Sequence, residues 1–528
     1  MPFSPSVDRI PPRTNNSRLT HRLTHPTHFI SKNVFLYGLG TGSTGRSYST
    51  ATSARFEDED PYWRRVPQWR DVSAEEFISY RWQQNANTVT VNPRNMAMLE
   101  KFLAANLPDS ISQSQDSRLR QIQTREQFIE EVFSGIEASS MSPRLTPHLL
   151  SVIDWHNPLD DPIRQQFIPI KSSLLPDHPA LEYDSLHEEE DSPVPGLVHR
   201  YPAKALFLAT SICPVYCSYC TRSYAVGVPT KSLNTKAVQK PSRKRWEVVF
   251  NHIENTPVLE DIVVSGGDTY MLQPKDILEI GTRLLSIPHI KRIRFATKGL
   301  AVMPGRTLDP TDGWTQAFID LSNQGRRAGK QVQICASASA DHHVRLCIHT
   351  HFNHPNEITW VTREAAKYLF KHGVIVRNQS VLLKGINDDA HTMGTLITEL
   401  ANMNYQPYYV YQCDLVPKVE HLRTPLKTII DLENELRGTI GGFMLPSFIC
   451  DLPGGGGKRL ACSYESYENG VSTYRAPGLT KGDKGTKVYE YHDPLPSEDV
   501  LEEQSNEDVG NEVDYPVPEE RAYAQAST

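Results

Sequence analysis

The chain has 528 residues, of which 38% are hydrophobic and 22% are charged, with a formal net charge of −7. This composition allows a sizeable core and excludes wholesale disorder. No apolar run approaches the roughly 18 residues of a membrane-spanning helix, so a membrane protein is excluded. The negative charge argues against a nucleic-acid-binding surface. Eight cysteines in a chain of this length exclude a disulfide scaffold.

The two ends of the chain differ from its middle. Residues 1–55 carry seven Arg and Lys residues against one acidic residue, and they are rich in Ser and Thr. Such a composition is typical of a mitochondrial transit peptide, which we predict at 1–56. The alternative is a disordered N-terminus on a cytoplasmic protein. Residues 493–528 hold eleven Asp and Glu residues and one Arg, which predicts a solvated acidic tail.

The middle of the chain alternates between short apolar runs and helical patterns. This alternation predicts a parallel α/β sheet, open or closed into a barrel, with its reactive residues at the carboxyl ends of the strands. Strands are predicted at 205–212, 261–265, 292–295, 345–349, 374–376 and 408–411, with a last extended run at 445–450. Helices are predicted at 274–286, 312–325, 361–372, 389–402 and 425–438.

The segments on either side of the first predicted strand differ in character. Residues 57–200 contain several tryptophans and a helical pattern at 125–137, which predicts a mainly helical N-terminal domain. Residues 201–452 are predicted to form the α/β core. Two stretches, 229–246 and 324–344, are predicted to be surface loops.

A cysteine motif follows the first predicted strand. Cys213, Cys217 and Cys220 have the spacing C-x3-C-x2-C. Cysteine thiolates are the usual ligands of iron–sulfur clusters, and three of them leave one iron of a [4Fe–4S] cluster open to a small molecule. A zinc site needs a fourth ligand, and none is obvious; cysteines placed by chance are the remaining alternative. The spacing resembles that of the radical S-adenosylmethionine (SAM) superfamily, in which SAM occupies the open iron and is cleaved to an adenosyl radical.

Two further motifs stand at predicted strand ends. Ser265, Gly266, Gly267 and Asp268 end the second strand. The glycines let the backbone approach a ligand, and the acid can pair with an ammonium, although Gly-Gly-Asp turns are also common without a ligand. This segment resembles the one that holds the SAM amino group in the radical SAM superfamily.

Lys458 follows four glycines. The segment is not a P-loop, because an arginine stands where Ser or Thr is required. A lysine on such a backbone can form a Schiff base with an aldehyde cofactor, of which pyridoxal phosphate (PLP) is the commonest. The alternative is a flexible surface loop.

Taken together, these pieces resemble the lysine 2,3-aminomutase family from about residue 62 to about residue 477. The densest likeness lies in EDSPVPGLVHRYP (190–202), THFNHPNEIT (350–359), NQSVLLKGIND (378–388), YYVYQCDL (408–415) and DLPGGGGK (451–458). The resemblance implies an incomplete (βα)6 radical SAM barrel, with residues 453–492 as a PLP-lysine segment and C-terminal extension. It also implies three cofactors, which are a [4Fe–4S] cluster, SAM and PLP.

The resemblance also assigns roles to individual residues. It implies that Lys458 binds PLP and that Arg222 binds the substrate carboxylate, while Asp414 and Asp451 grip the substrate side-chain ammonium. By the same resemblance, the cluster ligands are Cys213, Cys217 and Cys220; Arg200 and Tyr201 lie beside PLP; and Ser265, Gly266, Gly267, Asp268, His351 and Gln379 line the SAM pocket. One family arginine is replaced by Lys204, which puts the phosphate geometry there in doubt.

The implied function is the interconversion of L-lysine and β-lysine by 2,3-amino migration. Arginine is an alternative substrate because it also presents a cation, and a radical SAM enzyme that modifies other molecules without PLP is an alternative activity. A one-electron reductant of unknown identity is required, and a homo-oligomer is possible. The structural zinc site of the bacterial enzymes is predicted to be absent, because Asp389 replaces one cysteine and no cysteine follows Cys462.

Overall fold

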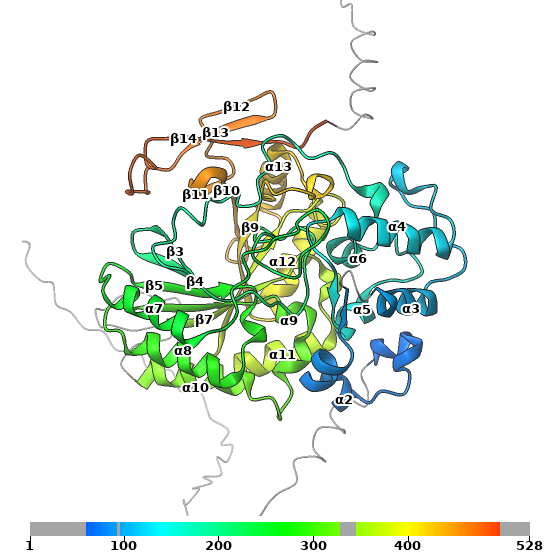
Figure 1. Ribbon diagram of the computed structural model, residues 1–528, viewed down its shortest axis with the longest axis horizontal. Coiled ribbons are helices and arrows are strands. Elements are labelled where there is room, and N and C mark those ends of the chain that lie inside the picture. The colour runs from blue at the N-terminus through cyan, green and yellow to red at the C-terminus, as the bar shows by residue number, and fades with distance from the viewer. Residues whose placement is uncertain (1–59, 92–95, 328–344, 497–528) are drawn as a thin grey trace, which may run out of the picture. The chain divides into compact units, whose positions relative to one another are not determined.

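One mixed sheet organises the protein. The computed structural model describes residues 60–91, 96–327 and 345–496, and in these ranges nine strands pair in the order β11-β10-β9-β8-β7-β6-β5-β4-β3 (Figure 1). Strands β4 to β10 are parallel, and the edge strands β3 and β11 are antiparallel to their neighbours. The bounds are β3 Leu197–Tyr201, β4 Lys204–Thr210, β5 Asp261–Gly266, β6 Arg292–Ala296, β7 Arg345–His351, β8 Ile375–Val381, β9 Tyr405–Tyr411, β10 Ser447–Leu452 and β11 Gly457–Leu460.

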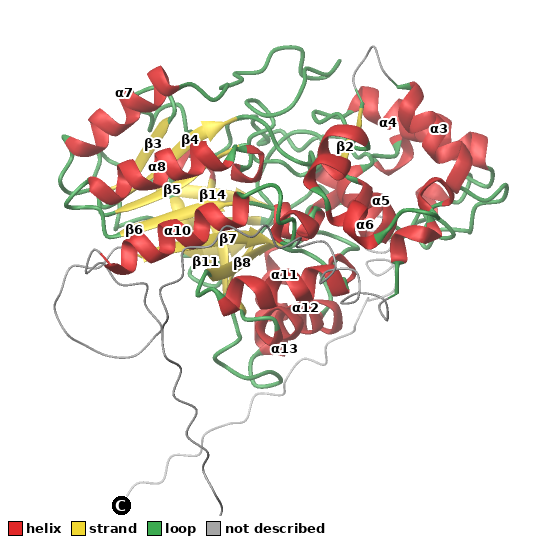
Figure 2. Ribbon diagram, turned by 90° about the horizontal axis from the view of Figure 1, so that it is seen from below, coloured by secondary structure: helices red, strands yellow, loops and turns green. Residues whose placement is uncertain are grey.

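Helices connect the parallel strands and lie along the sheet (Figure 2). Their bounds are α7 Arg243–Glu254, α8 Pro274–Ser286, α9 Gly299–Val302, α10 Trp314–Arg327, α11 Trp360–Lys371, α12 Ala390–Asn402 and α13 Leu426–Leu436. The predicted incomplete α/β barrel is therefore confirmed, with β4 to β9 as its six predicted strands. The antiparallel edge strands β3 and β11 were not predicted, because both are short and lack a long apolar run.

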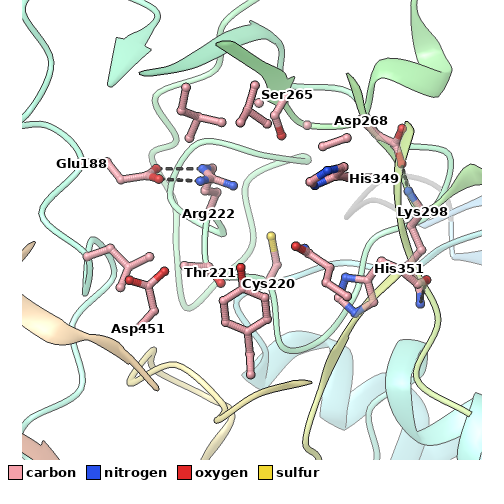
Figure 3. A pocket seen from close by; sticks show the side chains of 18 of the residues that line it. Glu188, Cys220, Thr221, Arg222, Ser265, Asp268, Lys298, His349, His351 and Asp451 are labelled. Carbon is pink, nitrogen blue, oxygen red and sulfur yellow. Dashed lines mark hydrogen bonds and ion pairs between the residues drawn. The ribbon is translucent and has the colours of Figure 1, made fainter. Parts of the chain in front are cut away.

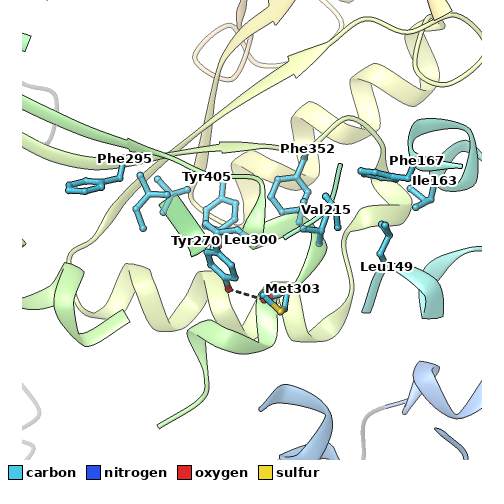
Figure 4. Packing of buried hydrophobic residues seen from close by; sticks show 14 of the residues in the cluster. Leu149, Ile163, Phe167, Val215, Tyr270, Phe295, Leu300, Met303, Phe352 and Tyr405 are labelled. Atoms are coloured by element: carbon cyan, nitrogen blue, oxygen red, sulfur yellow. Dashed lines mark hydrogen bonds between the residues drawn. The ribbon is translucent and has the colours of Figure 1, made fainter. Parts of the chain in front are cut away.

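The residues before the barrel are mainly helical and share its core. Their elements are α2 Ala74–Ile78, β1 Val89–Thr90, α3 Ala97–Asn106, α4 Arg125–Ala138, β2 Arg144–Leu145, α5 Pro147–Val152 and α6 Pro162–Phe167, with a π-helix at Arg81–Ala86 and short 3-10 turns elsewhere between them. Helix α4 begins at a capping box in which the Thr124 and Gln127 side chains each bond the other residue's backbone. Phe167 of α6 belongs to one buried apolar cluster with Val215 and Phe352 of the barrel (Figure 4). Burial of this shared surface holds the helical part against the cysteine loop.

A small antiparallel sheet follows the barrel. It consists of β12 Ser466–Glu468, β13 Val471–Arg475 and β14 Val488–His492, and it lies beside the β10–β11 hairpin (Figure 1). The buried Tyr491 hydroxyl of β14 donates to the Cys413 carbonyl at 2.9 Å. It also accepts from Gln412 Nε2 at 3.1 Å. These bonds attach the small sheet to the chain just after β9.

The structure corrects the predicted loop at 229–246. Helix α7 begins at Arg243, and Trp246 is only 2% exposed. Trp246, Val249, Phe250 and Ile253 form a helical apolar stripe that packs on the sheet. The helix was not predicted because its first residues are basic and resemble those of an exposed loop. In the other predicted loop, α10 continues to Arg327, and 328–344 lie outside the described residues. No helix among the described residues is long and apolar enough to cross a membrane.

Candidate functional site

Every site residue predicted from the sequence lines a single cavity. Its volume is about 350 Å³, and it extends from the carboxyl ends of the parallel strands to Lys204 at the start of β4. Figure 3 shows Glu188 and Asp451 on one side and Asp268, Lys298 and His351 on the other, with Cys220 between them. Parallel strands bring residues that are distant in sequence to one end of a sheet, which explains the convergence.

The cysteine loop forms one wall of the cavity. Cys213 and Cys220 contact the apolar side chains of Met141, Tyr216 and Val226. Burial raises the pKa of the Cys217 thiol to about 12. Binding of iron displaces such protons, because the thiolate is the ligand. In the described part of the chain, no three His, Cys, Asp or Glu side chains gather around a single metal ion. This result is compatible with a [4Fe–4S] cluster, because each cysteine of such a site binds a different iron.

The cysteine loop is held from behind by buried polar side chains. Asn353 Nδ2 donates to the Tyr219 hydroxyl at 2.8 Å and to Gln166 Oε1 at 3.1 Å. The backbone N–H of Ser218 donates to the Gln166 carbonyl at 2.9 Å. Gln166 belongs to α6, so the helical part of the protein fixes the position of the loop.

The segment from Ser265 to Asp268 packs tightly on the end of β4. A Cβ on Gly266, which has a φ of 110°, would lie 2.2 Å from the Thr210 carbonyl oxygen. A Cβ on Gly267 would lie 2.7 Å from the Ile212 backbone nitrogen. Both glycines are thus required by close approach of backbone to backbone, a reason that the sequence did not reveal. A ligand role for this segment stays a prediction.

Asp268 serves as a backbone acceptor in the structure. Its two carboxylate oxygens each accept one backbone N–H at 2.7 Å, from Tyr270 and from Lys298. The side chain therefore joins the end of β5 to the loop after β6. The predicted pairing with the SAM amino group stays a prediction.

Lys458 lines the same cavity as the cysteine loop. It stands on β11 directly across the hairpin from Asp451 on β10, and its ammonium forms an ion pair with the Asp451 carboxylate. Burial would lower the pKa of Lys458, but the negative charge of Asp451 outweighs it and the pKa is raised. Asp451 Oδ1 has no hydrogen-bond partner among the described residues. A buried acceptor of this kind is suited to a second cationic donor.

Asp414 is the second carboxylate near Lys458. It follows β9 and accepts a hydrogen bond from the Thr221 hydroxyl, next to the cysteine loop. Burial and the neighbouring charge of Asp451 raise the pKa of Asp414 to about 6. The structure thus brings together the two carboxylates that the sequence paired, and their mutual repulsion favours a cation between them.

Arg222 makes a contact that sequence analysis did not predict. Its Nε donates to Glu188 Oε2 at 2.8 Å and its Nη2 donates to Glu188 Oε1, as the dashed lines in Figure 3 show. The Tyr224 hydroxyl also donates to Glu188, at 3.0 Å. Glu188 lies among four consecutive acidic residues, 188–191, and nothing in that run distinguishes it from solvated acids.

His351 and Gln379 line the cavity at the ends of β7 and β8. Tyr408 donates to Gln379 Oε1 at 2.8 Å and bonds His349 Nδ1 at 2.9 Å. Tyr408 and Tyr411 both line the cavity, although strict strand alternation would place them on opposite faces. A register shift between β8 and β9 at Asn378/Gln379 accounts for this placement.

Basic side chains surround the Lys458 end. Arg200 Nε donates to the buried Asp191 at 2.8 Å. Lys204 Nζ lies 3.8 Å from the centroid of the Tyr201 ring, and burial lowers its pKa to about 8. The Tyr201 hydroxyl accepts the backbone N–H of Lys458 at 3.1 Å. The residues present therefore fit the two implied groups, with three thiols for iron and an amine among cations for a phosphorylated aldehyde.

Known proteins support this assignment. No protein-family model matches the chain. The L-lysine 2,3-aminomutase of Clostridium subterminale is 34% identical over 395 residues, covering 75% of this chain and 80% of that protein. The chain belongs to the lysine 2,3-aminomutase family. The L-lysine 2,3-aminomutase of Bacillus subtilis is 33% identical, with 75% of this chain and 71% of that protein covered.

Membership in the lysine 2,3-aminomutase family confirms the predicted enzyme class, an isomerase that moves an amino group, and the predicted cofactors. Among solved structures, Streptococcus suis SuiB bound to S-adenosylmethionine matches with a TM-score of 0.31 and 12% identity, covering 48% of this chain and 51% of that chain. A likeness of this size adds nothing to the assignment.

Proposed function

We propose that the protein interconverts L-lysine and β-lysine (3,6-diaminohexanoate) by moving the 2-amino group to carbon 3. The observation that carries this proposal is the ion pair between the Lys458 ammonium and Asp451, beside a second, half-buried carboxylate, Asp414. When bound, the cluster and SAM supply an adenosyl radical that removes a hydrogen atom from carbon 3, and PLP carries the amino group during its shift.

Lys458 and the substrate use the same carboxylates in turn. If Lys458 held PLP through its amine, the buried Asp451 carboxylate would lose its cation, which is unfavourable. The side-chain ammonium of lysine restores a positive charge between Asp451 and Asp414. The reaction then requires that carbon 3 stay near the radical source, and a gripped side chain holds it there.

Arg222 supplies the contact for the other end of the substrate. Glu188 occupies its Nε and Nη2, so the guanidinium is oriented before the substrate arrives. In the described part of the chain Nη1 makes no hydrogen bond, and it is the atom we assign to the substrate carboxylate. A lysine bound between Arg222 and the two aspartates is held at both ends.

Two alternatives are tested by the same experiment. Arginine also presents a cation to Asp414 and Asp451, and a radical SAM enzyme without PLP would not need Lys458. Protein reconstituted anaerobically with iron, sulfide, PLP, SAM and a reductant is incubated with lysine, arginine, ornithine and glutamate. We expect β-lysine from lysine and little product from the others. If arginine is turned over faster than lysine, arginine and not lysine is the substrate.

Use of PLP has its own test, which does not depend on activity. Borohydride reduction of the PLP-loaded protein, followed by peptide mapping, should place the pyridoxyl group on Lys458. A label on another lysine, or no label, contradicts the assigned role of Lys458.

We also propose import into mitochondria, supported only by the composition of residues 1–55, which lie outside the described residues. N-terminal sequencing of the protein from isolated mitochondria would show cleavage near residue 56. The one-electron reductant and a homo-oligomeric state are further proposals, testable by electron-donor screening and by sedimentation.

A further inference from the structure

The segment after β13 covers the glycine turn that precedes Lys458. A Cβ on Gly456 would lie 2.7 Å from the ring of Tyr489, and a Cβ on Gly455 would lie 3.0 Å from Lys484 Nζ. The Tyr489 hydroxyl donates to the Lys484 carbonyl at 3.0 Å. We call residues 476–492 the C-terminal cover. Its side chains occupy the space that these two glycines leave open.

The C-terminal cover also contributes a charge to the interior. Lys484 Nζ lies 2.8 Å from Asp191 Oδ1, and Arg200 Nε lies 2.8 Å from Asp191 Oδ2. The Asp191 side chain is 0% exposed, and those of Lys484 and Arg200 are 14% and 6% exposed. A fully buried carboxylate thus has Arg200 from the cavity wall and Lys484 from the cover at 2.8 Å, with Lys481 of the cover farther away at 3.5 Å.

Arg200 is shared between two carboxylates. The negative charges of Asp451 and Asp191 both act on its guanidinium, against a burial that alone would lower its pKa. Its Nη2 donates to the Leu186 carbonyl, which fixes the plane of the group. If Asp191 lost Lys484, its unbalanced charge would draw Arg200 more strongly, away from the cavity and from Asp451.

We propose that Lys484 is a positioning residue for the Lys458 end of the cavity, where its ammonium balances Asp191 and so holds Arg200 in place beside Asp451. The proposal rests on the proposed function in one respect, which is that PLP binds beside Arg200. The C-terminal cover would then help to build the site through two contacts, the ion pair between Lys484 and Asp191 and the packing of Tyr489 on Gly456.

Lys481 provides a matched control on the same segment. Its Nζ is 3.5 Å from the same oxygen of Asp191, but its side chain is 58% exposed. A solvent-exposed ion pair contributes little, so Lys481→Met should leave the site unchanged. Lys484→Met should raise the PLP dissociation constant about ten-fold. This is the loss expected for one charge-assisted contact that affects PLP only through Arg200. Lys484→Arg keeps the charge and should restore most of the affinity.

The measurement is a fluorescence titration of the purified full-length protein with PLP, with iron content and SAM affinity determined on the same samples. A role confined to PLP positioning leaves iron content and SAM affinity unchanged. If Lys484→Met does not fold, Lys484→Gln, which keeps a hydrogen-bond donor without the charge, is used in its place. Equal PLP affinity in the Lys484 and Lys481 variants, or parallel loss of iron and PLP, overturns the proposal. Failure of borohydride to label Lys458 in the unaltered protein would instead overturn the proposed function.

Discussion

Asp451 and Lys458 face each other across the β10–β11 hairpin and form an ion pair inside the active-site cavity. The pair joins the two ends of the motif DLPGGGGK, so the glycine turn between them returns the lysine to the carboxylate. The same carboxylate is assigned to the substrate ammonium. A side chain of the protein therefore occupies the position that the substrate is expected to take.

The energetic link between these two residues can be measured directly. Lys458→Ala leaves a carboxylate that is 5% exposed without its nearest cation, and we expect a loss of about 1–3 kcal/mol in the free energy of unfolding. In Lys458→Ala/Asp451→Asn the stranded charge is gone, so most of that loss should return. Urea unfolding of the protein without cofactors gives both values. If the loss of unfolding free energy in the double variant equals the sum of the losses in the two single variants, the two residues have no energetic coupling.

Substrate recognition by the aspartate pair predicts a large effect of neutral replacements. Asp451→Asn should raise KM for lysine by about ten-fold to over a hundred-fold, because a charged hydrogen bond contributes roughly 1.5–3 kcal/mol. The rate at saturation should also fall, since a loosely held side chain lets carbon 3 drift. Steady-state kinetics at saturating PLP and SAM measure both effects. If Asp451→Asn and Asp414→Asn both leave lysine kinetics unchanged, the aspartates are structural.

Asp414 also makes substrate binding depend on pH. Its pKa is raised to about 6, mainly by burial and then by Asp451, so below that pH it is protonated and neutral. A neutral group does not attract the lysine ammonium, and KM for lysine should rise as the pH falls through 6. The increase is limited to about ten-fold per pH unit for one proton. Asp414→Asn, already neutral, should show no such inflection. An inflection retained in that variant would assign it to another group.

Much of the fold could be predicted because buried parallel strands have continuous apolar sequences. Helix α8, predicted at 274–286, has those bounds, and β5, predicted at 261–265, ends one residue later. The residues at the ends of β5, β7 and β8 converge because parallel strands end at one edge of the sheet. Arg200, Tyr201 and Lys458 stand on the antiparallel edge strands, so their place in the site was predicted from the family resemblance and not from strand order.

Contacts between distant segments could not be predicted. A Cβ on Gly457 would lie 2.6 Å from the Tyr201 hydroxyl, a residue on the other edge of the sheet order. Tyr489 likewise contacts Gly456, and it belongs to β14, a short strand with few apolar residues. The space beside Gly456 and Gly457 is filled by tyrosine side chains from distant strands, and such contacts leave no local pattern in the sequence.

Metal content tests the predicted absence of zinc. Asp389, which replaces a family cysteine, accepts the Thr392 backbone N–H at 2.8 Å and caps the first turn of α12. Purified protein should contain iron and sulfide at cluster stoichiometry and zinc only in traces, as measured by plasma emission spectrometry. The Cys217→Ala variant should lose the iron. Zinc at one ion per chain after dialysis against a chelator would show that other residues replace the missing ligands.

Glu188 allows the orientation of Arg222 to be separated from its charge. Glu188→Gln removes the negative charge opposite the guanidinium but keeps an oxygen that can accept a hydrogen bond from Nε or Nη2. A guanidinium without a competing carboxylate attracts the substrate carboxylate more strongly, so KM for lysine should fall several-fold. With its two-point anchor lost, Arg222 holds the substrate less rigidly, and kcat should fall as well. Tyr224→Phe, which removes a neighbouring donor to Glu188 and keeps the ion pair, serves as the control and should change both constants little. A rise in KM at constant kcat in Glu188→Gln would instead indicate that Glu188 itself binds the substrate.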